Sequence, residues 1–165
     1  MNARGWMRQG LAVLAFGASL AATASLAQED EHDEHVFAAG AITIDHPWAR
    51  AAAAGSDTLA FFETENEGGP DILLSASTTI AASVEIVGLA LTGDTIDMVP
   101  VGPIEIPTGT FELDPGGLAL ALRGLTADLA EGTEFELTLV FAEAGEVTVH
   151  VAVETADAMT HGHAH

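Results

Sequence analysis

The sequence predicts a single all-β domain, an antiparallel β-sandwich with Greek-key connections. Apolar residues recur in strand-length segments that are rich in β-forming types. Turn residues separate these segments at close spacing, and no window carries the sustained 3.6-residue apolar stripe of a surface helix. Short strands joined by such turns are typical of sandwiches, and the length suits one hydrophobic core.

Nine segments have the length and composition of strands. Turns that contain glycine or proline lie between them, for example "AGSD" at 54–57, "NEGGPD" at 66–71 and "DPGG" at 114–117. Glycine supplies a positive φ and proline fixes φ, so these turns can reverse the chain. The segment "LTADLAEG" at 125–132 has the pattern of one short helical turn. The expected strands are, in order, 41–49, 58–66, 71–77, 83–91, 95–101, 109–113, 118–125, 133–142 and 146–154.

Alternation in the last two segments assigns their faces, because residues two apart in a strand point to the same side. The polar members of both segments then face solvent, and among them is His150, which we expect to be a solvated surface residue. The residues expected to face the core are Phe135, Leu137, Leu139, Phe141, Val147, Val149, Val151 and Val153.

The first 27 residues have the pattern of a secretory signal peptide. Arg4 and Arg8 form a basic start, "LAVLAFGASLAATA" is a short apolar run, and "SLA" precedes Gln28 as a cleavage site. The apolar run is shorter than the roughly 20 residues that cross a bilayer, so we expect export without membrane insertion.

The composition is strongly acidic and contains no cysteine. Asp and Glu number 25 against four Lys and Arg, which gives a formal net charge of −21. Such a surface repels nucleic acid and other copies of itself, so we expect no nucleic-acid partner and a monomer. Without cysteine, thiolate metal sites and Fe–S clusters are excluded. After the signal only Arg50 and Arg123 are cationic, and we expect Arg50 to pair with a carboxylate.

Catalysis is not predicted. The sequence lacks G-x-S-x-G and H-E-x-x-H, and it has no Cys, Lys or Tyr, so most arrangements of nucleophile and base have no members. Carboxylates are abundant, but abundance does not position them as a catalytic pair.

The two ends of the exported chain carry groups of potential metal ligands. The tail "MTHGHAH" places Met159, His161, His163 and His165 on alternate positions, which share one side of an extended segment. Imidazole binds Cu(II), Zn(II) and Ni(II), and a thioether extends the range to Cu(I), so we expect copper first. The alternative is that these histidines only aid solubility. We expect residues 156–165 to be a flexible tail.

The segment 28–38 is expected to be a disordered arm, with the sandwich over 39–155. The arm begins with "QEDEHDEH", in which His32 and His35 lie among carboxylates that can complete a coordination shell. Binding at either flexible end must order the chain at about 1 to 2 kcal/mol per residue. Such sites are therefore expected to be weaker than a preformed site and suited to capture and hand-over.

Several segments together resemble the PCu(A)C family of periplasmic copper chaperones. They are "HPWARA" at 46–51, "FFETENEGGPDILLSAS" at 61–77, "VEI" at 84–86, "MVPV" at 98–101, "IEIPTG" at 104–109, "ELDPGG" at 112–117 and "RGLTADLAEGTEFELTLVFAEAGEVTV" at 123–149. The resemblance implies a cupredoxin-like sandwich in the periplasm. It also implies delivery of Cu(I), held by two histidines and two methionines, to the copper centre of a respiratory oxidase or another copper carrier.

Only one of the four implied ligands is present. By the resemblance, the ligand positions fall on Val87, Met98, Ala119 and Ala121. If the alignment of the last two ligand positions is shifted by one residue, they fall on Leu120 and Leu122, which also cannot coordinate. The family's further methionines correspond to Leu89 and Leu91. Since one thioether cannot hold an ion alone, the usual copper site is expected to be absent, with Met98 filling space. His46 and Trp48 of "HPW" are expected to be structural.

Two functions follow. In the first, an exported copper-binding protein has moved metal capture from the fold's usual site to its His/Met tail. In the second, a sandwich without metal docks a partner through an aliphatic patch near Val87, Leu89, Ala119 and Ala121.

Overall fold

The computed structural model describes residues 35–161, which form eleven strands and no helix. The expected signal peptide lies outside the described residues. The described part of the chain also contains no helix with the length and hydropathy of a membrane span. The strands are β1 (Val36–Ala39), β2 (Ile42–Arg50), β3 (Thr58–Asn66), β4 (Asp71–Ser77), β5 (Ala81–Thr92), β6 (Thr95–Pro100), β7 (Ile104–Ile106), β8 (Gly109–Leu113), β9 (Leu118–Leu125), β10 (Glu134–Phe141) and β11 (Gly145–Glu154).

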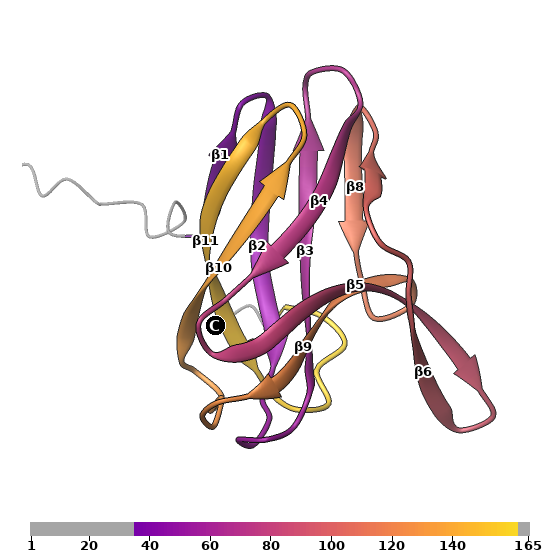
Figure 1. Ribbon diagram of the computed structural model, residues 1–165, viewed down its shortest axis with the longest axis vertical. Helices are drawn as coiled ribbons and strands as arrows, with labels where there is room; N and C mark the ends of the chain where they lie inside the picture. The colour runs from indigo at the N-terminus through magenta and orange to yellow at the C-terminus, as the bar shows by residue number, and fades with distance from the viewer. Residues whose placement is uncertain (1–34, 162–165) are drawn as a thin grey trace, which may run out of the picture. The chain divides into compact units, whose positions relative to one another are not determined.

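The strands form a β-sandwich, as the sequence predicts. Hydrogen bonds link them in the order β6-β5-β9-β3-β2-β11-β10-β4-β7, while β1 pairs with β2 and β8 pairs with β3. The continuous sheet folds over itself, so that β4 and β10 lie across β2 and β3 (Figure 1). All pairs are antiparallel except β2 with β11, which run parallel from Trp48 opposite Ala152 to Arg50 opposite Glu154. The predicted antiparallel sandwich is therefore confirmed, with one parallel pair that was not expected.

All nine expected strands are present, and two more are found. The first, β1, lies where a disordered arm was expected to reach residue 38. It pairs with β2 across the turn at Gly40, whose φ is 56°, and Phe37 packs against the main core. The second, β7, lies between the expected strands 95–101 and 109–113 and pairs with β4. Residues 125–132 form no helical turn; Leu129 instead bridges to Ala52.

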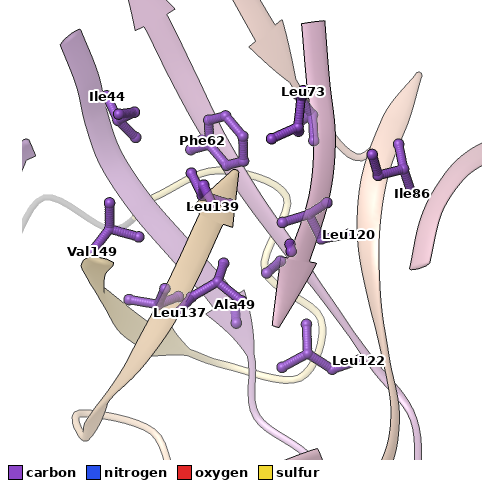
Figure 2. Close-up of a cluster of buried hydrophobic side chains, with 14 of the residues drawn as sticks. Ile44, Ala49, Phe62, Leu73, Ile86, Leu120, Leu122, Leu137, Leu139 and Val149 are labelled. Atoms are coloured by element: carbon purple, nitrogen blue, oxygen red, sulfur yellow. The ribbon is translucent and has the colours of Figure 1, made fainter. Parts of the chain in front are cut away.

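The main core lies between the two layers. Figure 2 shows Leu137, Leu139 and Val149 pointing toward side chains from β2, β3, β4 and β9. The alternation predicted for the last two strands is confirmed, except that Val147 is only half-buried at the start of β11. The four inward residues of β10 are at most 7 % exposed.

A bulge interrupts β2 at His46. The register with β3 shifts between Asp45 and Trp48, and His46 has a φ of 46°, which is the left-handed region that residues other than glycine rarely adopt. The bulge falls where β2 stops pairing with β1 and begins to pair with β11. Bulges re-aim side chains at sheet edges, and this one leaves the His46 side chain exposed.

Candidate functional site

The positions at which the resemblance implies copper ligands meet in one apolar cluster. Val87 lies opposite Ala119 in the β5–β9 ladder, and Val87, Ala119 and Ala121 are all 0 % exposed. They pack with Trp48, Leu59 and Phe61, and we call these six residues the Trp48 cluster. Leu89 and Met98 pack against it and are half-buried. Leu120 and Leu122, the alternative positions, are buried in the main core.

Burial in the Trp48 cluster withdraws three of the four residues named for the docking patch, and the fourth, Leu89, is half-buried. Val87, Ala119 and Ala121 were expected to present an aliphatic surface to a partner, but none of them reaches solvent. They instead complete the packing around the indole of Trp48, whose ring centroid lies 4.6 Å from that of Phe61. The structural role expected for Trp48 is confirmed.

Met98 faces a guanidinium group. Its Sδ lies 3.8 Å from Nη1 of Arg123, whose Nε and Nη1 each lie 2.9 Å from a carboxylate oxygen, of Glu85 and Asp57 respectively. Hydrogen bonds from the backbone N–H of Gly124 and from Arg123 hold the pKa of Asp57 below its usual range. The only family ligand position that keeps a donor atom is therefore beside a cation, which opposes metal binding there.

Replacing Arg123 with leucine is expected to lower the free energy of unfolding by about 1 kcal/mol. The effect is small because the two carboxylate side chains are 41 % and 43 % exposed, so solvent screens both ion pairs. Urea unfolding measures it. The double variant Asp57→Asn/Glu85→Gln is the matched control and should lose a similar amount. A loss above about 3 kcal/mol in Arg123→Leu alone would show that the guanidinium acts as a buried charge.

Residues 156–161 lie against the sandwich, where a flexible tail was expected. The Arg50 guanidinium donates from Nε to the carbonyl oxygen of Ala158 at 2.8 Å and from Nη2 to Sδ of Met159 at 3.3 Å. Ala158 packs on the Trp48 cluster, and Arg50 also lies over the ring of Phe61. Among residues 35–161 Arg50 has no carboxylate partner, contrary to expectation, because it holds the start of the tail.

Three histidines from distant parts of the sequence lie close together. The ring of His161 is 5.4 Å from that of His46 and 6.1 Å from that of His35, centroid to centroid. His46 donates its backbone N–H to the carbonyl oxygen of His35 at 2.9 Å, which extends the β1–β2 ladder. Nδ1 of His161 lies 3.2 Å from Oε1 of Glu154. His32, His163 and His165 lie outside the described residues.

The position of His46 beside His35 and His161 was not foreseen, since His46 was expected only to be structural. A local signal existed: a hairpin that turns at Gly40 puts His46 opposite His35. The approach of His161 had no signal in the sequence, because it depends on how the tail folds over Trp48. His150, by contrast, is exposed as predicted; it stacks on Phe37 and lies 4.0 Å from Oε1 of Glu136.

Carboxylates border the histidine group. Asp45, Glu63 and Glu112 lie directly opposite one another across β2, β3 and β8, and like charges in such register destabilise a sheet. All three line a hollow of about 210 Å³ together with His46 and His161. Burial, and then the charges of Asp114 and Glu63, raise the pKa of Glu112. The hollow therefore combines imidazoles with concentrated negative charge.

As they stand, the described side chains do not form a closed coordination shell. Within residues 35–161, no three His, Asp or Glu side chains are grouped so that they could hold an ion without moving. The residues expected to bind metal are nevertheless separated: His35 and His161 lie together with His46, while Met98 lies apart beside Arg123. Met159, expected to extend the tail's row of ligands, contacts Arg50.

Comparisons with known proteins agree on one family. Residues 42–153 match the family model described as "Putative lipoprotein LpqE-like". The apo PCuAC domain of PmoF1 is 31 % identical, covers 73 % of this chain and 99 % of its own, and superposes with a TM-score of 0.62. The copper-bound PCuAC domain of PmoF2 is 30 % identical, covers 73 % and 98 %, and has a TM-score of 0.60.

A third solved structure, CuI-DR1885 from Deinococcus radiodurans, is 27 % identical over 67 % of this chain and 78 % of its own, with a TM-score of 0.51. No curated protein matches the chain.

Proposed function

The chain belongs to the LpqE-like family, whose fold is that of PCuAC copper-chaperone domains, and from this premise we propose that it is an exported copper carrier with a displaced metal site. The family is one of copper chaperones rather than of enzymes. In this chain the copper would be captured by histidines at the ends of the sandwich, and no longer between β5, β6 and β9.

One observation carries this proposal. Three of the four positions at which family ligands are implied hold aliphatic side chains that are completely buried in the Trp48 cluster. If only some ligands of a buried site were lost, each remaining imidazole would be left unpaired at a cost of about 1 to 3 kcal/mol. Loss of both histidines instead leaves an apolar cluster that packs without water. Around this packed sandwich, His35 and His161, which precede and follow it in the sequence, lie beside His46 of β2.

A site at the ends suits the transfer of copper. Loading requires histidine side chains to turn toward one ion, because their described arrangement is open, and this cost lowers affinity and favours release to a partner. The recipient we propose is the copper centre of a respiratory oxidase or another copper carrier in the periplasm. The acidic surface, with a formal net charge of −21, favours a monomer that attracts cations.

Deleting residues 159–165 is expected to lower copper affinity about tenfold or more, because it removes His161 and the histidines after it. Competition titration with Cu(I) and with Cu(II) measures this on the protein purified after export. The control keeps the tail but replaces Met159 with leucine and its three histidines with asparagine, and it should lose the same affinity. Equal affinity in the full and shortened chains would contradict capture at the tail.

A further inference from the structure

We propose that His35, His46 and His161 form a single Cu(II) site at the junction of β1, β2 and the tail, with Glu154 orienting His161. This inference rests on the copper binding proposed above and specifies where the ion sits and in which oxidation state. It joins the N-terminal and C-terminal histidines in one site and adds His46, which belongs to the folded body.

The spacing of the rings is the first support. An imidazole nitrogen binds such an ion at about 2.0 Å, which puts the ring centroid about 3.1 Å from the ion. Two rings on one ion therefore have centroids between about 4.5 Å, for adjacent ligands in a plane, and about 6.3 Å, for opposite ligands. The observed separations of 5.4 and 6.1 Å fall within this range.

The surroundings of the His35 and His161 rings are the second support for this site. Nδ1 of His35 is buried and makes no hydrogen bond within residues 35–161, and a buried polar atom in this state indicates a missing partner such as an ion. Oε1 of Glu154 lies 3.2 Å from Nδ1 of His161, within ion-pair distance, and a turn of the ring on loading would bring Nδ1–H into line to donate to it. Carboxylates commonly orient metal-binding histidines in this way, which leaves Nε2 to bind the ion.

The backbone conformation at His46 is the third support for this site. A φ of 46° at a residue other than glycine costs of order 1 kcal/mol or more, and such strain persists where the side chain has a function. The bulge aims the His46 side chain out of the ladder, toward the ring of His161. A glycine would satisfy this backbone without strain, so the histidine is explained by its imidazole.

The donor set selects the oxidation state. Three imidazoles and nearby carboxylates, among them Asp45 and Glu63, suit Cu(II), whereas Cu(I) prefers thioethers and thiolates. Met159 is the nearby thioether, but the Arg50 guanidinium lies 3.3 Å from its Sδ. The row of carboxylates across β2, β3 and β8 adds attraction for a dication. Loading must turn the rings toward one ion, because the described arrangement is open.

The test uses the protein purified after export and four single variants. His35→Ala, His46→Asn and His161→Ala each remove one imidazole, and asparagine tolerates the left-handed backbone at position 46. His150→Ala is the matched control, since His150 is exposed and its ring stacks on Phe37. We expect each of the first three to weaken Cu(II) binding about tenfold or more. Each should also remove one nitrogen from the hyperfine pattern in the electron paramagnetic resonance spectrum, while His150→Ala changes neither.

The outcomes separate the two proposals. If the unmodified protein binds neither Cu(I) nor Cu(II), the proposed function fails. If it binds copper but His46→Asn retains full affinity and an unchanged spectrum, the joint site is wrong and the tail acts alone. Thermal melts of the apo variants check folding, and a His46→Gly variant, which removes the imidazole and adopts the left-handed backbone without strain, should lose copper affinity while remaining folded.

Discussion

Replacing Val87 and Ala119 with histidine and Ala121 with methionine is expected to create a Cu(I) site beside Met98. The four positions belong to or border the Trp48 cluster, and Val87 lies opposite Ala119. Without copper, two buried imidazoles in an apolar cluster should lower the free energy of unfolding by about 3 to 5 kcal/mol. Cu(I) at about 1,000 times its Kd would restore about 4 kcal/mol, so the melting temperature should recover on loading.

The matched control carries the same three substitutions together with Met98→Leu. It removes the fourth ligand and should recover little of its stability with Cu(I). If Cu(I) stabilises neither form, the assignment of these four positions to the family's ligands is wrong. If the unmodified chain gains as much stability from Cu(I) as the triple variant does, the Trp48 cluster already holds the metal and the displacement of the site is refuted.

Replacing Asp71 with alanine is expected to lower the free energy of unfolding by about 3 kcal/mol. The side chain is 5 % exposed and accepts hydrogen bonds from the backbone N–H groups of Ile72 at 2.7 Å, Glu143 at 2.9 Å and Ala144 at 2.8 Å. Without the carboxylate, these N–H groups lose their acceptor near the start of β4 and in the β10–β11 turn. Urea unfolding at neutral pH gives the value.

The same carboxylate predicts a pH dependence. Burial acts to raise the pKa of Asp71, but hydrogen bonds from the backbone N–H groups of Glu143, Ala144, Ile72 and Ala142 outweigh it and hold the pKa below its ordinary value of 3.8. Its contribution is therefore complete well above pH 3.8 and is lost as the pH falls through the lower folded pKa.

The Asp71→Asn variant provides the comparison. It keeps one carbonyl acceptor and does not titrate, so the stability difference from the unmodified chain should shrink as the pH falls below the ordinary pKa of aspartate. A difference that stays constant from neutral pH into this acidic range would contradict the assignment.

The sequence predicts most of the fold because strand alternation and turn residues are local signals. Leu137 and Leu139 are placed correctly by alternation alone. The parallel pairing of β2 with β11 leaves no such signal, since it depends on how distant strands meet in the folded chain. Strand β1 was not predicted, because the acidic run before Val36 indicated a disordered arm and the hairpin around Gly40 is short.

The candidate site was predictable only in its components. His35 and His161 were recognised as potential ligands from composition, and the loss of the family's ligands was read from Val87, Ala119 and Ala121. The contact between the ends depends on the Arg50 guanidinium, which holds Ala158 and Met159 against the sandwich. His46 was judged structural because "HPW" lies in a strand, and the bulge that turns its side chain outward is a tertiary feature.

The position of copper in the loaded protein tests the account most directly. Crystals of the chain grown with Cu(II) and measured at the copper absorption edge would locate the ion by its anomalous signal. We expect one strong peak among the rings of His35, His46 and His161, with no signal in the Trp48 cluster. A peak next to the sulfur of Met98, between β5, β6 and β9, would contradict the account.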